Sequence, residues 1–268
     1  MDRRQFSFLA SALALAPELA FAAPPSRALE RAVNNPHRSP ANRIRDRFRH
    51  PALALAFWGL APGMTVIEIE PAGGYWTEIL APYLLATHGR YIAAVPPGGM
   101  AAFKAHYADA AVWGPIEVVA FSPQSGPLAP AGTADMVLTI RNFHDWMWRP
   151  GLVAKYLADF RAALKPRGIL GVVDHRADPR PMHDDAHDGY VSTAFLENAV
   201  TKAGFKLDGS SEINANPKDT KDYPFGVWTL PPTRQTHAKG QPTPPGFNEA
   251  KYEAIGESDR MTLRFRKT

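Results

Sequence analysis

The sequence of 268 residues contains no cysteine. This absence excludes a thiol nucleophile, a disulfide framework and any metal or iron–sulfur centre held by cysteine. Three catalytic motifs are also missing, the Gly-x-Ser-x-Gly elbow, the Walker A loop and the His-Glu-x-x-His zinc motif, which argues against a serine hydrolase, a nucleoside triphosphatase and a zincin. The net charge is only +4 and no basic block occurs, so nucleic acid is not expected as a partner.

Long apolar runs are scarce as well, and the one near the N-terminus has the features of an export signal. Arg3 and Arg4 precede an apolar run over residues 6–16, and an Ala-Phe-Ala segment ending at Ala22 supplies small residues for cleavage. The run is shorter than the roughly 20 residues that span a membrane, and no stable membrane insertion is expected. The paired arginines resemble a twin-arginine signal, with an ordinary secretory signal as the alternative. We expect residues 1–22 to be removed and the mature protein to be periplasmic.

The mature chain divides into a helical segment, residues 23–60, and a larger domain, residues 61–268. In the first part, apolar residues at helical spacing are interrupted by prolines, which predicts two or three short helices. In the second part, β-branched apolar runs alternate with helical patterns, as in a parallel α/β sheet. A proline-rich insertion, residues 214–258, is expected to fold over the sheet as a lid. The predicted strands cover residues 65–69, 91–95, 116–121, 136–140, 169–173, 205–213 and 261–266, and the predicted helices cover 75–86, 100–112, 152–164 and 191–203.

One segment carries a motif of known chemistry. Residues 66–74 place an acidic residue, Glu68, near the end of a strand and continue into a glycine-rich turn and a helix. This segment resembles motif I of class I S-adenosylmethionine-dependent methyltransferases, and residues 134–144 and 164–170 resemble the fourth strand of that family and the turn into its fifth. Four shorter segments are similar to an exported bacterial group of predicted methyltransferases, namely residues 73–80, 171–176, 214–222 and 256–259.

The resemblance implies a doubly wound, mainly parallel seven-stranded α/β sheet whose last two strands form an antiparallel pair. It also implies S-adenosylmethionine as cofactor and methyl transfer to a small-molecule acceptor in the cell envelope. In the family, the glycine turn lets the backbone approach the cofactor, and the following helix offers its N-terminus to the cofactor's carboxylate. Here Glu70 and Ala72 stand at two glycine places of the motif, and the second strand lacks the usual acid at its end. The implied cofactor-binding residues are Glu68, Glu70, Gly73, Gly74, Tyr75 and Asn142.

Further polar residues follow the predicted fourth and fifth strands, at the edge where open α/β sheets bind ligands. His144 and Asp145 follow the fourth strand, and Asp174 and His175 end the fifth. Histidine and aspartate in such pairs act as base and orienting group, or as metal ligand and supporting partner. We expect these four residues to be catalytic, with His144 deprotonating or orienting the acceptor together with Asp145 or His175. The alternative is that both histidines only bond loop backbone at the strand ends.

Other interpretations of the sequence stay open. His183 and His187 have a spacing that suits metal ligands on a helix, but the prolines and glycine around them favour a solvated loop, and no metal is assigned there. The fold could instead carry metal-assisted or acid–base chemistry without S-adenosylmethionine, around Glu70, His144 and the end of the fifth strand. A third possibility is a periplasmic protein that binds a small ligand without turnover. Fold alone does not separate these functions.

Overall fold

The computed structural model describes residues 24–179, 182 and 186–268. The predicted leader, residues 1–22, and the predicted loop histidine His183 therefore lie outside the described residues. Within the described part, none of the helices combines the length and the apolar character needed to cross a membrane.

Four short helices come before the first strand, where the sequence predicted two or three. The side chains of Ser26 and Ser39 accept hydrogen bonds from backbone N–H groups at the start of the first two helices. Pro40 and Pro51 each stand in a first helical turn, where a missing N–H costs nothing. The left-handed His50, with φ of 41°, separates the last two helices. The helices are α1 (Arg27–Val33), α2 (Pro40–Arg43), α3 (Asp46–Arg49) and α4 (Pro51–Trp58).

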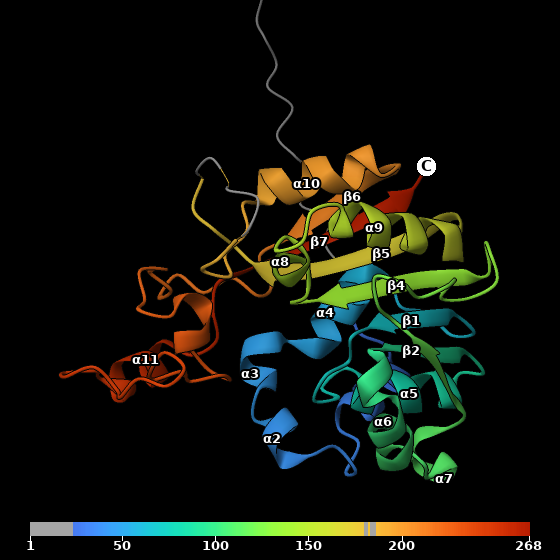
Figure 1. The fold of residues 1–268 in the computed structure, drawn as a ribbon. Helices are drawn as coiled ribbons and strands as arrows, with labels where there is room; N and C mark the ends of the chain where they lie inside the picture. The colour runs from blue at the N-terminus through green and yellow to red at the C-terminus, as the bar shows by residue number, and fades with distance from the viewer. Residues whose placement is uncertain (1–23, 180–181, 183–185) are drawn as a thin grey trace, which may run out of the picture.

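The centre of the molecule is one seven-stranded sheet with the strand order β3-β2-β1-β4-β5-β7-β6 (Figure 1). The first five strands are parallel, and β7 runs antiparallel to both β5 and β6. This confirms the predicted doubly wound, mainly parallel sheet and its antiparallel last pair. The strands are β1 (Thr65–Ile69), β2 (Arg90–Val95), β3 (Ile116–Ala120), β4 (Ala134–Ile140), β5 (Leu164–His175), β6 (Phe205–Ser211) and β7 (Arg260–Lys267).

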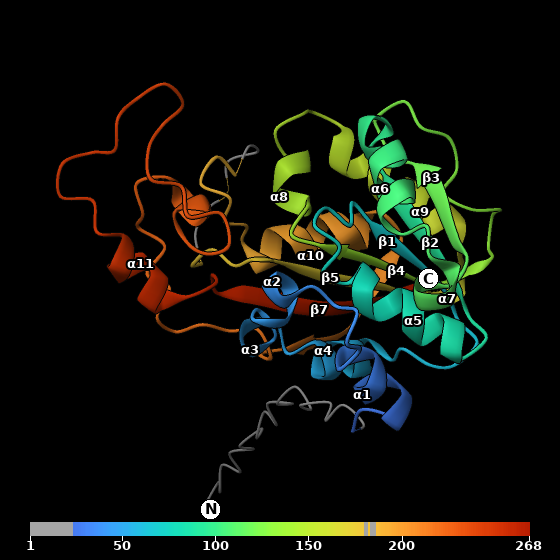
Figure 2. The same cartoon turned by 90° about the horizontal axis from the view of Figure 1, so that it is seen from below.

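Helices cover both faces of the sheet and create two cores. Alternate residues of one strand enter different cores: Ile67 and Ile69 face one core and Val66 faces the other. Figure 2 shows α1, α4 and α5 on one side of the strands and α8, α9 and α10 on the other. These further helices are α5 (Thr77–Ala86), α8 (Phe143–Trp146), α9 (Leu152–Ala163) and α10 (Thr193–Lys202).

The predicted helix over residues 100–112 is two helices in the structure, α6 (Met100–His106) and α7 (Ala110–Trp113). The break has a local cause, because the Asp109 carboxylate accepts a hydrogen bond from the Ala111 N–H and starts a new helix.

The insertion between β6 and β7 does not lie over a face of the sheet. It contains a 3-10 turn, η2 (Gly226–Thr229), and the helix α11 (Glu249–Ile255). In Figures 1 and 2 it extends beyond the ends of β4 and β5, on the side of the molecule where α3 lies. Its apolar residues Tyr223, Val227 and Leu230 form a small core with Tyr190. The insertion thus reaches the carboxyl ends of the parallel strands, where the predicted site residues are.

Candidate active site

The turn that follows β1 keeps the backbone shape of a glycine-rich motif. Glu70, Ala72 and Gly74 have φ values of 47°, 45° and 72°, so all three are left-handed. They occupy the three alternate positions at which the methyltransferase motif has glycine. A side chain in this conformation costs about 1–2 kcal/mol, and two of the three residues bear that cost. The turn is therefore left-handed at all three positions, although only one of them is glycine.

The two glycines of the turn differ in what surrounds them. A Cβ at Gly74 would lie 1.7 Å from the Tyr107 hydroxyl oxygen, so any other residue there requires the Tyr107 side chain to shift. At Gly73, no atom lies within 4 Å of the position that a Cβ would take. The Asn42 amide of α2 donates a hydrogen bond to the Gly73 carbonyl at 3.1 Å and attaches the turn to the N-terminal helices.

Two other residues predicted to bind the cofactor support the turn from the sheet. Glu68 is 2% exposed and accepts hydrogen bonds from the hydroxyls of Thr77, at 3.0 Å, and Tyr91, at 2.5 Å. Burial outweighs these bonds and raises the pKa of Glu68 to about 7. The Asn142 amide donates to the Ile69 carbonyl at 2.9 Å and so joins the ends of β4 and β1.

Tyr75, the next residue of the predicted set, contacts the N-terminal helices. Its hydroxyl donates to Asp46 at 2.7 Å. The guanidinium groups of Arg38, Arg45 and Arg49 lie 5.3, 5.6 and 4.6 Å from the centre of its ring. Sequence analysis did not single out these arginines, because nothing in a short helix marks which side chains meet a distant turn.

A cavity lies on each side of the turn. The β2 cavity, about 560 Å³, is mostly apolar and includes Val95, Phe103 and Tyr107. The arginine cavity, about 360 Å³, is polar and lies between α3, β1, β4 and the insertion. Both volumes fall in the range of small-molecule sites. The two cavities share Pro71, Ala72 and Gly73 of the turn, so one extended ligand lying over the turn would reach both. The arginine cavity is lined by Arg45, Arg49, Glu68, Ile69, Glu70, Pro71, Ala72, Gly73, Tyr75, Trp76, Ile140, Arg141, Asn142, Asp145, Pro232 and Thr233.

Glu70 lines the arginine cavity in a defined position. Its carboxylate accepts a hydrogen bond from the Trp146 indole N–H at 3.0 Å, and its backbone N–H donates to the Ala94 carbonyl at 2.9 Å. Burial raises the pKa of Glu70. The side chain that replaces the motif's first glycine is thus fixed by α8 and does not fold back over the turn.

The four residues predicted to be catalytic come together, with one pairing that the sequence did not predict. The His144 Nδ1 lies 2.7 Å from the Asp174 carboxylate, a contact that joins α8 to the end of β5. Asp174 is fully buried and also accepts from the backbone N–H of His175 at 2.7 Å. Burial lowers the pKa of His144, but the charge and hydrogen bond of Asp174 together outweigh burial and raise the pKa above its ordinary value. Asp145 lies 3.5 Å from the Nε2 of His144, the ring atom that Asp174 does not occupy. His144 therefore has the orienting partner that a general base needs.

His175 has a different environment, with both ring nitrogens engaged. Its Nδ1 lies 2.5 Å from the Ser258 hydroxyl, and its Nε2 accepts from the Arg141 Nε at 3.2 Å. Burial and the Arg141 charge hold its pKa well below the usual range, so the ring is neutral. Ligand atoms of His144, Asp174 and His175 lie within 4.8 Å of one another, close enough for one metal ion. The guanidinium that already donates to His175 opposes a second cation at that position.

The Trp228 ring of η2 lies at an edge-on angle to His144, with 6.0 Å between the ring centres. The insertion therefore contacts the histidine through this ring.

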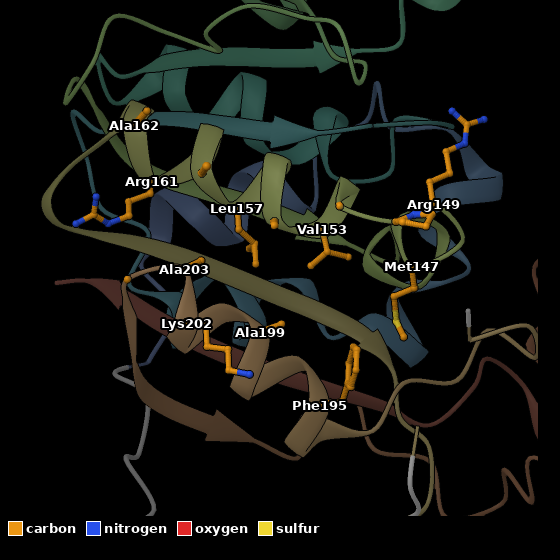
Figure 3. A pocket seen from close by; sticks show the side chains of 15 residues that line it. Met147, Arg149, Val153, Leu157, Arg161, Ala162, Phe195, Ala199, Lys202 and Ala203 are labelled. Atoms are coloured by element: carbon orange, nitrogen blue, oxygen red, sulfur yellow. The ribbon is translucent and has the colours of Figure 1, made fainter. Parts of the chain in front are cut away.

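A larger cavity, about 890 Å³, lies away from this edge, between α9 and α10. Figure 3 shows Val153 and Leu157 of α9 facing Phe195 and Ala199 of α10 across it. Among the described residues that line it, the titratable ones are Arg149, Arg161 and Lys202, so this cavity offers no carboxylate or imidazole as a general base. The candidate active site is the turn with its two cavities and the adjacent His144–Asp174 pair.

No model of a known protein family matches the chain, and no curated protein matches it in sequence. Solved structures do match. A SAM-dependent methyltransferase from Aquifex aeolicus is 16% identical with a TM-score of 0.57, over 86% of this chain and 94% of that one. The [4+2]-cyclase SpnF is 14% identical with a TM-score of 0.52, over 84% and 80% of the two chains. The CurJ carbon methyltransferase is 13% identical with a TM-score of 0.50, over 90% and 58%. At such identities the likeness concerns the fold: this chain has the class I S-adenosylmethionine-dependent methyltransferase-like fold.

Proposed function

We propose that this protein transfers a methyl group from S-adenosylmethionine to a small-molecule acceptor. The observation that carries the proposal is the turn after β1, where positions 70, 72 and 74 are all left-handed and a cavity opens on each side. Backbone strain at residues other than glycine persists where the surroundings enforce it, and such strain is concentrated at functional sites. A turn whose only role was to link β1 to α5 would not need left-handed backbone at three positions.

The residues around the turn fit the methyl donor in most respects. Gly73 leaves open space beside both cavities, which allows a ligand to approach the backbone. The apolar and aromatic lining of the β2 cavity suits a nucleoside, with Phe103 and Tyr107 as its rings. The charged lining of the arginine cavity suits the amino-acid end. One feature of the family is missing, because no carboxylate lines the β2 cavity to bind ribose hydroxyls. When bound, the donor supplies an electrophilic methyl group on a sulfonium.

In this proposal, the His144–Asp174 pair acts on the methyl acceptor. Asp174 holds the His144 ring through Nδ1, and the acceptor's proton passes to Nε2 as its oxygen, nitrogen or carbon attacks the methyl carbon. The donor would supply the leaving group of this displacement, a neutral thioether released as its carbon–sulfur bond breaks. Positioning of the two reactants supplies the rest of the rate enhancement. His175 supports this arrangement through Arg141 and Ser258 and takes no proton.

The test is calorimetric titration of the protein with S-adenosylmethionine and S-adenosylhomocysteine. We expect one-to-one binding with micromolar affinity, near −8 kcal/mol. Gly73→Val adds a side chain where nothing lies within 4 Å, so it should fold normally and weaken binding about 100-fold. Gly126→Val is the matched control, since Gly126 is exposed and its Cβ position is equally open. Absence of saturation at millimolar ligand with folded protein would exclude the methyl donor.

Turnover separates an enzyme from a binding protein of the same fold. The cyclase among the similar structures illustrates that this fold is compatible with other reactions. His144→Ala is expected to bind the donor with wild-type affinity and to lose transfer to any acceptor that the wild type methylates. Transfer at an unchanged rate would exclude His144 as the base.

We also propose that the protein acts in the cell envelope, because of the leader-like residues 1–22. Fractionation of cells that express the full chain tests this. Arg3→Lys with Arg4→Lys should keep the protein in the cytoplasm if the twin-arginine route is used. Export of that variant would indicate an ordinary secretory route, and a wild-type protein that stays in the cytoplasm would overturn the location.

A further inference from the structure

Two arginines that line the arginine cavity share one buried carboxylate with a third arginine. Arg45, which precedes α3, Arg49 of α3 and Arg260 of β7 all donate to Glu257, at 2.8, 2.9 and 2.6 Å. Against the effect of burial, the charge of these guanidinium groups holds the pKa of Glu257 well below its usual range. Three cations thus share one anion.

Arg49 has hydrogen-bonding capacity that no group in the described part of the chain uses. Its side chain is 5% exposed, and its Nη2 is buried without a hydrogen-bond partner among the described residues. One face of the guanidinium lies against the Tyr75 ring, at 4.6 Å, and Nε is committed to Glu257. Buried N–H groups almost always have partners, and an unpaired one on a charged group is costly. The residue lines the arginine cavity, where a ligand can supply the partner.

Arg141 is the third arginine, after Arg45 and Arg49, among the described residues that line the arginine cavity. Its backbone is left-handed, with φ of 64°, and its Nε donates to the neutral ring of His175. Burial lowers its pKa to about 10, so it stays charged at neutral pH. No carboxylate forms an ion pair with Arg141 anywhere in the described part of the chain.

The described acidic groups that line this cavity form no hydrogen bond or ion pair with Arg49 or Arg141. Glu68 and Glu70 belong to β1 and its turn, and Asp145 belongs to α8. Burial raises the pKa of all three. Their hydrogen bonds and ion pairs go to hydroxyls, to the Trp146 indole and to His144, not to Arg49 or Arg141.

We propose that Arg49 and Arg141 bind the carboxylate of a small ligand in the arginine cavity. Two ligands of the proposed reaction are possible sources: the amino-acid end of the methyl donor and an acidic group of the acceptor. The charge argument holds without any methyl transfer, and only the choice between these sources rests on the proposed function.

The experiment compares the wild type with Arg49→Met and Arg141→Met, which remove one charge each but keep an unbranched side chain. Lys206→Met is the control, because Lys206 is exposed on β6 and far along the chain from the cavity. Binding is measured by calorimetry for S-adenosylhomocysteine, for 5′-methylthioadenosine, which lacks the amino-acid end, and for acetate and benzoate. Circular dichroism and thermal melting establish that each variant is folded. Loss of a charge-assisted hydrogen bond should weaken carboxylate binding about 10- to 100-fold.

The set of ligands that lose affinity in the variants identifies whether the bound carboxylate belongs to the methyl donor or to the acceptor. If the donor's carboxylate is bound, both variants weaken S-adenosylhomocysteine and leave 5′-methylthioadenosine unchanged. If the acceptor's acid is bound, S-adenosylhomocysteine keeps its affinity, while benzoate or acetate binds the wild type and not the variants. Carboxylate binding without nucleoside binding would support this inference and refute the proposed function. The inference is overturned if folded variants bind every carboxylate as the wild type does, or if the wild type binds none.

Discussion

The pairing of His144 with Asp174 makes a measurable prediction about stability and pH. Asp174→Asn keeps the size of the side chain and removes the negative charge that faces the His144 ring at 2.7 Å. The Asp174 carboxylate is fully buried and accepts two backbone N–H groups besides the ring, so solvent cannot replace the lost charge. Breaking a buried pair by removing one partner costs about 3–5 kcal/mol. For a domain of this size, a loss of about 3 kcal/mol corresponds to a decrease in Tm of about 6–12 °C.

The sign of the pH dependence follows from the direction in which the His144 pKa moves. Asp174 raises this pKa in the folded protein above its ordinary value of 6.5, against the effect of burial. A group of this kind contributes its full stabilisation below the unfolded pKa and loses it as the pH rises through the folded pKa. The difference between wild type and variant should therefore be largest near pH 6 and shrink toward pH 9.

Urea denaturation at several pH values, followed by circular dichroism, measures this difference. Asp208→Asn is a suitable control, because Asp208 forms ion pairs on the surface with Arg264 and Arg266, and such pairs contribute about 0–1 kcal/mol. An Asp174→Asn loss below about 1 kcal/mol, or a loss equal at pH 6 and pH 9, would refute the assignment of a buried charged pair.

Three further variants test other parts of the site by the same denaturation assay. Gly74→Ala should lower the free energy of unfolding by about 2–4 kcal/mol, because of the left-handed φ and the clash with the Tyr107 hydroxyl. Adding Tyr107→Phe should restore part of that stability. If it restores none, the clash is not the cause. Glu257→Gln should cost about 3–5 kcal/mol at neutral pH, with the difference from wild type shrinking below about pH 4, because the wild-type carboxylate loses its contribution as it is protonated. The wild type should lose stability as the pH rises from about 4.5 to about 7, since the pKa of the buried Glu68 carboxyl is raised to about 7, and Glu68→Gln should remove this loss. If the variant and the wild type have the same pH profile, the pKa of Glu68 is not raised.

The fold was predictable because its signals are local. Each strand is a short apolar run between glycine, proline or polar residues, and the alternation of strands and helices restricts the topology to a parallel sheet. The differences between the predicted and the observed elements also have local causes. The sequence predicted a fifth strand from residue 169, whereas β5 begins at Leu164, since Leu164 pairs with Ala134 across an irregularity in the ladder. The helix α8 has four residues, which is too short to show a helical period.

The members of the site were predictable, but their partners were not. His144, Asp174 and His175 all follow from the rule that ligands bind at the carboxyl ends of strands. Asp174 and His175 are neighbours in sequence, but the partner of Asp174 is His144 of α8, which follows the adjacent strand β4. The contact of Arg49 with Glu257 joins residues 208 positions apart and leaves no signal in either segment.

The turn after β1 explains why a sequence motif and a structural motif can differ. Glycine serves such a turn in two ways, by allowing a left-handed backbone and by leaving room for a ligand. Here the first property is retained without glycine, because Glu70 is held by the Ala94 carbonyl and the Trp146 indole in the strained conformation. The second property depends only on where the side chains go, and Gly73 still opens to both cavities. Glu70 and Ala72 therefore alter the charge and the lining of the cavity, while the backbone of the turn stays left-handed at both positions. The expected consequence is a change in which ligands bind, not a loss of binding.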